Sequence, residues 1–345
     1  MKMLLLLALI AIPFFCNAQD LKNKHLDELF DRLETKNQAM GSFSIAEKGK
    51  VVYQRAFGYA SLNPEIKADS TTRYQVGSIS KTFTAVIILQ MVHEGKLSLQ
   101  EPLFRFFPKW PQAEQITIEQ LLRHRSGIHN FGEDRSEKYS LVNPQTREEI
   151  LEIFEQAPID FKPGSRAEYN NANYVVLSLI AEEIDGTSFT ETFQARIVKP
   201  LQLRYTYVGR NAGQPSHEAQ SYYWRRGWQK HPEGDLSTLM GAGAIVSTPA
   251  EVNVFFAAIF NEEFFPQEMI SKMISLEDGF GMGIFRYPFN HRSCYGHAGS
   301  IGAFESMAAH FPDEEISFAL CLNATRRPLN DVLVEALKVW FGEFD

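Results

Sequence analysis

The alternation of apolar and polar residues predicts a helix and then a two-stranded hairpin at the beginning of the folded chain. Residues 26–33 have apolar side chains at helical spacing, whereas 42–47 and 51–59 alternate between apolar and polar side chains. Lys48-Gly49 lies between the alternating runs and is a turn signal. We therefore expect a β-hairpin that begins near residue 42.

The middle of the chain has the apolar spacing of helices joined by long loops. Residues 82–92 are strongly apolar and the run stops at Gly95, which predicts a buried helix. The stretch 206–235 is rich in aromatic and charged residues and is assigned to no element. Further helices are expected at 117–123, 147–156 and 173–183.

The last third of the chain returns to strand patterns. A helix is expected at 251–261, three strands between 280 and 323, and a final helix at 329–340. Strands at both chain ends imply one sheet built from N- and C-terminal segments. The predicted fold class is α+β (an α/β sandwich), an antiparallel sheet flanked by helices with an inserted, mostly helical domain. The sheet subdomain would comprise about 19–75 plus 240–345, and the helical subdomain about 76–239.

The first 18 residues have the features of a signal peptide. Lys2 is followed by an apolar run too short to span a bilayer, and small residues end at Ala18, where we expect cleavage. Bulky Pro13-Phe14-Phe15 before Cys16 disfavours lipidation. The mature chain, 19–345, is expected to be secreted or periplasmic, with no stable membrane span.

Charge and cysteine placement narrow the class of protein. The formal net charge is −8 and no basic cluster occurs, which argues against a nucleic-acid partner. Cys294 and Cys321 lie in strand patterns with a third strand between them. Two strand spacings amount to about 9.6 Å, whereas a disulfide needs α-carbons within about 7 Å. We therefore expect free, buried thiols.

Ser78 and Lys81 form the only serine–lysine pair in the chain with a spacing of three residues, and they open the buried helix. Positions i and i+3 share a helix face, so the Lys81 amine can reach the Ser78 hydroxyl. A buried lysine loses its proton readily and can then accept one, which makes Ser78 a candidate activated nucleophile. The alternative is a helix start followed by a surface lysine.

Two distant segments have side chains suited to the same site. Tyr169 and Asn171 follow the turn signal Lys162-Pro163-Gly164 and precede a helix, so a phenol and an amide can face a cleft. Residues 295–300 end a strand pattern, and their glycines would let a ligand approach the backbone closely. The candidates in this last segment are His297, Gly299 and Ser300.

Together the three segments resemble the motifs of the serine β-lactamase and penicillin-binding-protein superfamily, in the branch whose middle motif is Tyr-x-Asn. That branch contains class C β-lactamases, serine DD-peptidases, D-amino-acid peptidases and β-lactamase-like esterases. Residues 121–127 and the glycine-rich strand pattern 241–248 are similar to two further segments of the branch. The resemblance extends from about residue 25 to residue 340.

The resemblance implies a β-lactamase/transpeptidase-like fold and a role for each matched residue. Ser78 would be the nucleophile, and Lys81 and Tyr169 the general acid and base; which of the two takes the first proton is left open. Asn171 would orient Lys81 or the substrate amide. The backbone N–H groups of Ser78 and Ser300 would form the oxyanion hole.

The third motif departs from the family pattern. Many β-lactamases have Lys-Thr-Gly where this chain has His297-Ala298-Gly299, and that lysine holds a permanent charge for the substrate carboxylate. Histidine carries a charge only below about pH 6.5. We therefore expect weak β-lactamase activity, and binding of carboxylated substrates that improves as the pH falls from 8 to 6. Gly299 is interpreted as a residue that fits the backbone to the site.

Other residues are assigned no catalytic role, and neither a cofactor nor a metal is expected. His124 is interpreted as structural, and its spacing of five from His129 misses the i, i+4 spacing of zinc ligands. The absence of Gly-x-Ser-x-Gly argues against an α/β-hydrolase. The aromatic residues interpreted as packing rather than cleft residues are Phe131, Tyr222, Tyr223 and Trp224.

The leading hypothesis is a secreted serine hydrolase that is acylated at Ser78 by a small-molecule or peptide substrate. A peptidase or amidase for D-amino-acid peptides ranks slightly ahead of an esterase, and a β-lactamase comes third. The alternative is a catalytically weak penicillin-binding or sensor protein of the same fold. The physiological substrate and the oligomeric state are left open.

Overall fold

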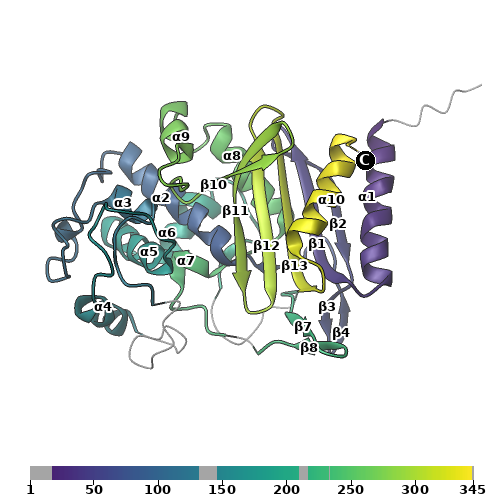
Figure 1. Cartoon of the computed structure of the whole chain (residues 1–345), viewed down its shortest axis with the longest axis horizontal. Coiled ribbons are helices and arrows are strands. Elements are labelled where there is room, and N and C mark those ends of the chain that lie inside the picture. The colour runs from purple at the N-terminus through teal and green to yellow at the C-terminus, as the bar shows by residue number, and fades with distance from the viewer. Residues whose placement is uncertain (1–17, 132–145, 210–216, 233, 344–345) are drawn as a thin grey trace, which may run out of the picture.

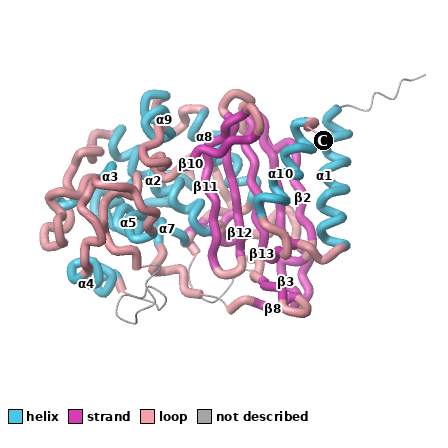
Figure 2. Tube along the Cα trace, viewed as in Figure 1, coloured by secondary structure: helices cyan, strands magenta, loops and turns pink. Residues whose placement is uncertain are grey.

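An antiparallel sheet divides the molecule into two layers of helices. Figure 1 shows the computed structural model, which describes residues 18–131, 146–209, 217–232 and 234–343. Helices α1 (Ala18–Thr35) and α10 (Leu329–Phe341) cover one face of the sheet, and a larger group of helices lies on the other side (Figure 2). The expected signal peptide, apart from Ala18, lies outside the described residues. No helix among the described residues is long and apolar enough to cross a membrane.

The main sheet joins the two ends of the chain. Its central order is β10-β11-β12-β13-β1-β2, and each neighbouring pair is antiparallel. β13 pairs with β1, which confirms the predicted sheet of N- and C-terminal segments and the hairpin at Lys48-Gly49. The three expected C-terminal strands are β11 to β13, and β10 precedes them. The bounds are β1 (Ala39–Glu47), β2 (Lys50–Phe57), β10 (Phe285–Phe289), β11 (Arg292–Ile301), β12 (Phe304–Phe311) and β13 (Ile316–Thr325).

Large apolar side chains fill the layer between the sheet and helices α1 and α10. Phe30 of α1 stacks on Phe57 of β2, with ring centroids 4.9 Å apart, and lies 5.4 Å from the ring of Phe43 of β1. Trp340 of α10 is buried in the same core. Each such side chain contributes roughly 1.5–3 kcal/mol through burial. This layer therefore stabilises the sheet from which β11 is presented to the site.

Helices α2 (Ser80–His93) and α8 (Pro249–Phe260) connect the sheet to the helical region. α8 packs on β1, β12 and β13. α2 is apolar on nearly every side, as a helix inside a core must be. Phe83 of α2 stacks on Phe255 of α8, with ring centroids 3.7 Å apart. The helix that follows Ser78 is therefore fixed relative to the sheet.

The helices and strands not yet described are shorter than α2 and α8, except for helix α5 (Asn171–Asp185). The other helices are α3 (Ile118–Leu122), α4 (Arg147–Gln156), α6 (Phe189–Phe193), α7 (Met240–Gly243) and α9 (Gln267–Ile274). The other strands are β3 (Tyr59–Leu62), β4 (Glu65–Lys67), β5 (Tyr74–Gln75), β6 (Tyr207–Val208), β7 (Tyr222–Trp224), β8 (Trp228–Lys230) and β9 (Ile245–Ser247). Every expected helix is present, and all but one lie within a few residues of their predicted bounds; the exception is α1, which begins eight residues before the predicted start at residue 26. Strands β6 to β8 occupy the stretch that was assigned to no element.

Two local expectations differ from the structure. Ser78 does not open the α-helix but lies in a 3-10 turn, Gly77–Ile79, and α2 begins at Ser80. Gly77 has a φ of +52°, which favours glycine and makes this tight turn possible. The segment 241–248 is not a strand throughout, because helix α7 occupies its first residues before β9 begins.

The cysteine prediction is confirmed, and the packing interpretation holds for two of the four aromatic residues. Cys294 and Cys321 are buried and free. Phe131 and Tyr222 are buried, whereas Tyr223 and Trp224 are exposed.

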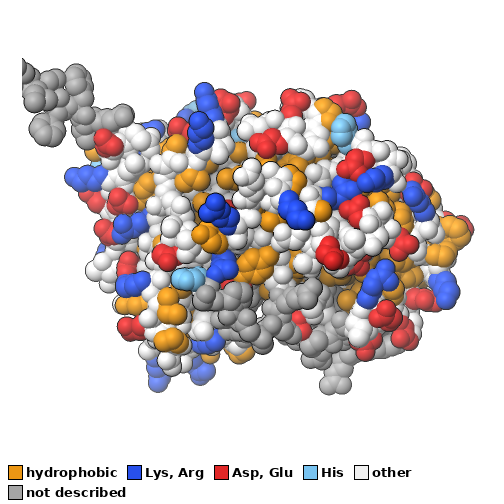
Figure 3. All heavy atoms as spheres, turned by 180° about the vertical axis from the view of Figure 1, so that it is seen from behind, with side chains coloured by type: hydrophobic (Ala, Val, Ile, Leu, Met, Phe, Trp, Pro, Cys, Tyr) orange, Lys and Arg blue, Asp and Glu red, His pale blue; other side chains and the backbone are white. Residues whose placement is uncertain are grey.

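On the face shown in Figure 3, basic and acidic side chains are interspersed rather than gathered by sign.

Candidate active site

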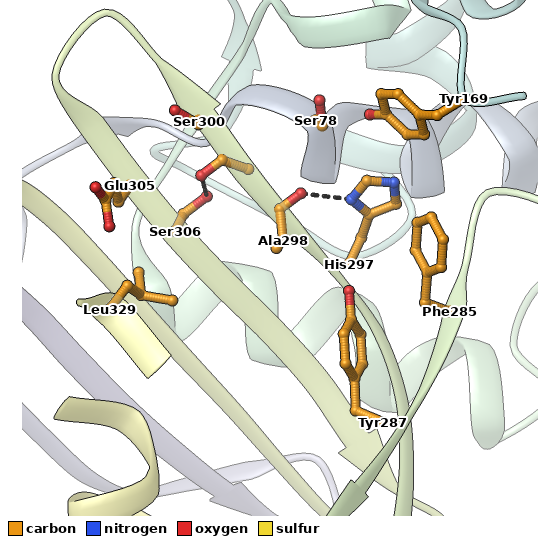
Figure 4. Close-up of a pocket in the computed structure, with 11 residues that line it drawn as sticks. Ser78, Tyr169, Phe285, Tyr287, His297, Ala298, Ser300, Glu305, Ser306 and Leu329 are labelled. Atoms are coloured by element: carbon orange, nitrogen blue, oxygen red, sulfur yellow. Dashed lines mark hydrogen bonds between the residues drawn. The ribbon is translucent and has the colours of Figure 1, made fainter. Parts of the chain in front are cut away.

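Ser78 lines a cavity of about 480 Å³ between the sheet and the helical region (Figure 4). The turn before α2, the loop before α5, strands β10 to β12 and the start of α10 all contribute to its wall. Five of the seven predicted site residues are among those that line it: Ser78, Tyr169, His297, Gly299 and Ser300.

Lys81, a sixth predicted residue, lies directly behind Ser78. Its side chain is fully buried, and Nζ donates to Ser78 Oγ (3.1 Å), Asn171 Oδ1 (2.7 Å) and the carbonyl oxygen of Ala242 (2.8 Å). Three acceptors match the three N–H bonds of an ammonium group. Burial lowers the pKa of Lys81 from 10.5 to about 7, because the charged form loses its hydration. Near neutral pH a large share of Lys81 is therefore an amine that can accept a proton.

The seventh predicted residue, Asn171, helps to fix the Lys81 amine. It is the first residue of α5, and its backbone N–H donates to Asn130 Oδ1 (3.1 Å). Ala242 belongs to α7, which packs against both α2 and α5. The position of the amine next to Ser78 is therefore determined by three helices.

Tyr169 lies in the loop before α5, and its phenol oxygen points toward Ser78 (Figure 4). Lys81 Nζ lies 4.9 Å from the centre of the tyrosine ring. The ring centroid is 4.6 Å from that of His124 and 6.1 Å from that of His297. The three motifs are therefore brought together around the Ser78 hydroxyl.

His124 supports the loop of Tyr169. It is 2% exposed, and its Nδ1 accepts a hydrogen bond from the Asn170 N–H (3.0 Å). Its carbonyl oxygen accepts one from the Glu168 N–H (2.9 Å). Burial, and then the charge of Lys81, hold the pKa of His124 well below its usual range, so the ring is neutral. These contacts agree with the predicted structural role.

No group of three or more metal-ligating residues occurs in the described part of the chain.

Strand β11 contacts the Ser78 turn through two glycines. A side-chain carbon at Gly299 would lie 3.0 Å from Ser78 N and would collide with the carbonyl oxygen of Val76. One at Gly77 would lie 2.9 Å from Ser300 N. Glycine at both positions therefore lets the two backbones touch, which brings the candidate oxyanion donors, the N–H groups of Ser78 and Ser300, onto adjoining backbones.

His297 corrects the expectation that this residue titrates near pH 6.5. It is 3% exposed, and its Nδ1 hydrogen-bonds the carbonyl oxygen of Ala298. Burial, followed by the charge of Lys81, lowers the pKa of His297 to about 3. The ring is therefore neutral from pH 8 to pH 6 in the ligand-free protein, so titration of His297 gives no reason to expect a gain in carboxylate binding over that range.

Several cavity residues were not predicted from the sequence. Phe285 is edge-on to His297, with ring centroids 4.9 Å apart. Strand register could have indicated two others, because Glu305 pairs with Ser300 and Ser306 with Gly299 across β11 and β12. Ala298 lies within the third motif, and no sequence signal marks Tyr287 or Leu329.

The fold and the arrangement around Ser78 define the class of protein as a serine hydrolase of the β-lactamase and penicillin-binding-protein type. The chain belongs to the Beta-lactamase family, whose match covers residues 26–337. The predicted superfamily and the β-lactamase/transpeptidase-like fold are therefore confirmed.

Similar proteins come from several bacteria. "Protein flp" of Staphylococcus aureus is 32% identical over 52% of this chain and 37% of its own length. A teichoic acid D-alanine hydrolase of the same species is 24% identical over 80% of this chain and 66% of its own length. The chain thus spans between about a third and two thirds of these relatives. The crystal structure of D-amino acid amidase from Ochrobactrum anthropi SV3 has a TM-score of 0.82 at 22% identity, over 94% of this chain and 99% of the amidase.

Proposed function

We propose that the chain is an exported serine hydrolase in which Ser78 forms a covalent acyl-enzyme with a D-amino-acyl amide or ester. The observation that carries this proposal is the 3.1 Å hydrogen bond from Lys81 Nζ to Ser78 Oγ beside the cavity. The signal-like segment 1–18 supports export.

In the proposed acylation, Ser78 Oγ attacks the substrate carbonyl carbon, and its proton passes to Lys81 or Tyr169. The N–H groups of Ser78 and Ser300 stabilise the negative charge on the carbonyl oxygen, each by about 3 kcal/mol. The base then returns the proton to the leaving nitrogen or oxygen as its bond to the carbonyl carbon breaks. In deacylation, water attacks the acyl carbon while the base accepts a proton from it. The base then returns that proton to Ser78 Oγ as the ester bond to Ser78 breaks.

The relatives favour the D-amino-acyl class of substrate. One is a teichoic acid D-alanine hydrolase and another a D-amino acid amidase, and both names denote removal of, or action on, a D-amino acid. Within the site, Asn171 would orient Lys81 or the substrate amide, and Gly299 would allow the substrate to approach the backbone of β11. We rank an amidase or peptidase slightly ahead of an esterase, and a β-lactamase third.

Hydrolysis of a small substrate panel tests this proposal. The panel comprises a p-nitrophenyl ester, a D-alanine amide and nitrocefin, each assayed with the wild type, Ser78→Ala and Ser70→Ala. We expect hydrolysis of the ester and the amide, slower hydrolysis of nitrocefin, and a loss of about a thousandfold or more in Ser78→Ala alone. Ser70 is an exposed serine and serves as the matched control.

Two outcomes would overturn the proposed activity. Full activity in Ser78→Ala would exclude this nucleophile. Labelling of Ser78 by a fluorescent penicillin without turnover of any substrate would favour a penicillin-binding or sensor protein.

A further inference from the structure

His297 has a buried ring nitrogen without a hydrogen-bond partner among the described residues. That atom is Nε2, and the residue that bears it lines the cavity and is 3% exposed. A buried polar atom without a partner costs about 1–3 kcal/mol. Because His297 lines the cavity, a ligand that displaces a neighbouring ring can reach this covered atom and complete its bonding.

The partner of the other ring nitrogen determines what Nε2 can do. Nδ1 bonds the carbonyl oxygen of Ala298, and a carbonyl oxygen can only accept. Nδ1 therefore carries the proton, and Nε2 of the neutral ring is a hydrogen-bond acceptor. Figure 4 shows Nδ1 directed at Ala298 and the opposite edge of the ring directed toward Tyr169.

The surroundings of the ring keep it neutral. Burial contributes most, because Tyr169 covers one side of the ring and the edge contact with Phe285 excludes water from another, and Lys81 adds a nearby positive charge. His124, whose ring contacts that of Tyr169, is neutral as well. These neighbours oppose a second proton on His297.

The charge of the cavity wall also disfavours a bound carboxylate. Among the described residues that line the cavity there is no lysine or arginine, and Glu305 carries the one formal charge. Lys81 is covered by Ser78 and its other two acceptors. A substrate carboxylate in this cavity would meet an acceptor nitrogen and a carboxylate, whereas an N–H group would find acceptors.

We propose that His297 determines specificity by accepting a hydrogen bond at Nε2 from an amide, hydroxyl or ammonium group of the substrate, and that it disfavours a carboxylate at that position. The inference rests on the proposed function and narrows its substrate class. The substrates would be aminoacyl amides and esters without a free carboxylate beside His297, rather than peptides that end in a carboxylate.

Binding of a matched ligand pair to the inactive Ser78→Ala protein tests this inference without requiring turnover. The pair is N-acetyl-D-Ala-D-Ala and its C-terminal carboxamide, measured by calorimetry at pH 6 and pH 8. We expect the carboxamide to bind at least tenfold more tightly at both pH values. In Ser78→Ala/His297→Lys, the added cation should reverse the preference, so that the carboxylate form binds more tightly.

Nitrogen NMR of ¹⁵N-histidine-labelled protein provides a readout that a purely structural role would not change. The His297 resonances, assigned by their loss in His297→Gln, should show a protonated Nδ1 and an unprotonated Nε2 from pH 8 to pH 5. The carboxamide should shift the Nε2 resonance toward that of a hydrogen-bonded acceptor, and the carboxylate should not.

Several results would overturn the inference: equal or tighter binding of the carboxylate by the His297 protein, binding of neither ligand, or a protonated Nε2 at pH 7. Turnover of a p-nitrophenyl ester by the wild type is measured in parallel. Failure of that reaction alone would contradict the proposed function and leave the ligand preference standing, so the two failures can be distinguished.

Discussion

Lys81 is a buried amine held only by neutral acceptors among the described residues: a hydroxyl, a side-chain amide and a backbone carbonyl. Such acceptors position the group but do not compensate for the loss of hydration as a carboxylate would. The same environment therefore fixes the amine beside Ser78 and lowers its pKa to about 7. Positioning and activation of the base have a single cause.

The pH dependence of ester hydrolysis should report this amine. Below the pKa, Lys81 is an ammonium ion and cannot accept the Ser78 proton, and above it the free amine can. We expect kcat/KM for an uncharged ester to rise between pH 5 and pH 8 with an inflection near pH 7. Lys81→Met should reduce the rate by about 10²–10⁴-fold and remove the inflection. A flat wild-type profile from pH 5 to pH 9 would contradict the role of Lys81.

The sequence was sufficient to select the residues of the three motifs, but not the rest of the cavity wall or the protonation states in the site. Three short motifs identified Ser78, Lys81 and Tyr169 because their order and spacing match a known pattern. The neutral state of His297 could not be predicted, because it depends on the burial of the ring and then on the charge of Lys81, both of which arise only in three dimensions. The support that Asn130 gives to Asn171 also depends on a contact between distant segments.

At the scale of elements, the contact between β11 and the turn before α2 places the candidate oxyanion donors. It depends on small residues, because Gly299 lies against Val76 and against Ser306, whose Oγ donates to the Val76 carbonyl oxygen (2.9 Å). A methyl group at Gly299 would push strand and turn apart and separate the N–H groups of Ser78 and Ser300.

We therefore expect Gly299→Ala to lower kcat by about 10²–10³-fold, the loss typical of a displaced oxyanion donor. The melting temperature should fall as well, because the strand must shift. Gly234→Ala is the matched control, since nothing lies within 4 Å of an added side-chain carbon at that position. Wild-type kcat in Gly299→Ala would show that this contact does not position the donors.

Helices and strands were predicted best where one regular spacing of apolar residues extends over many residues. The alternation at 42–59 predicted the β1–β2 hairpin, and the apolar periodicity predicted α4 and α10, whereas α2 was predicted by a continuous apolar run that stops at Gly95. The 3-10 turn at Gly77–Ile79 was missed because the apolar pattern does not distinguish it from the helix that follows. Strands β6 to β8 have only two or three residues each, too few for a period to be recognised.

At the scale of the whole molecule, burial of neutral histidines links stability to pH. Burial is the main cause that lowers the pKa of His124 well below its usual range, that of His297 to about 3, and that of His310 to about 4. In the unfolded chain these side chains titrate near 6.5. Below that pH the unfolded chain therefore binds more protons than the folded protein, and the folded state loses stability as the pH falls.

The free energy of unfolding should fall between pH 6 and pH 4.5 by about 1.4 kcal/mol per pH unit for each of these histidines. His310 lies outside the cavity, where its Nδ1 and Ser317 Oγ are 2.8 Å apart. His310→Gln should therefore reduce the slope by about 1.4 kcal/mol per pH unit. Urea unfolding of both proteins across this range measures the difference. Equal slopes would mean that His310 protonates in the folded state.

The central claim is that three distant segments converge to activate one hydroxyl, that of Ser78. Intact-mass spectrometry after incubation with a penicillin or a fluorophosphonate, followed by peptide mapping, tests it most directly. The account predicts one covalent adduct per chain, located on Ser78, present in Ser70→Ala and absent from Ser78→Ala. An adduct that persists in Ser78→Ala, or one that maps to another residue, would contradict it.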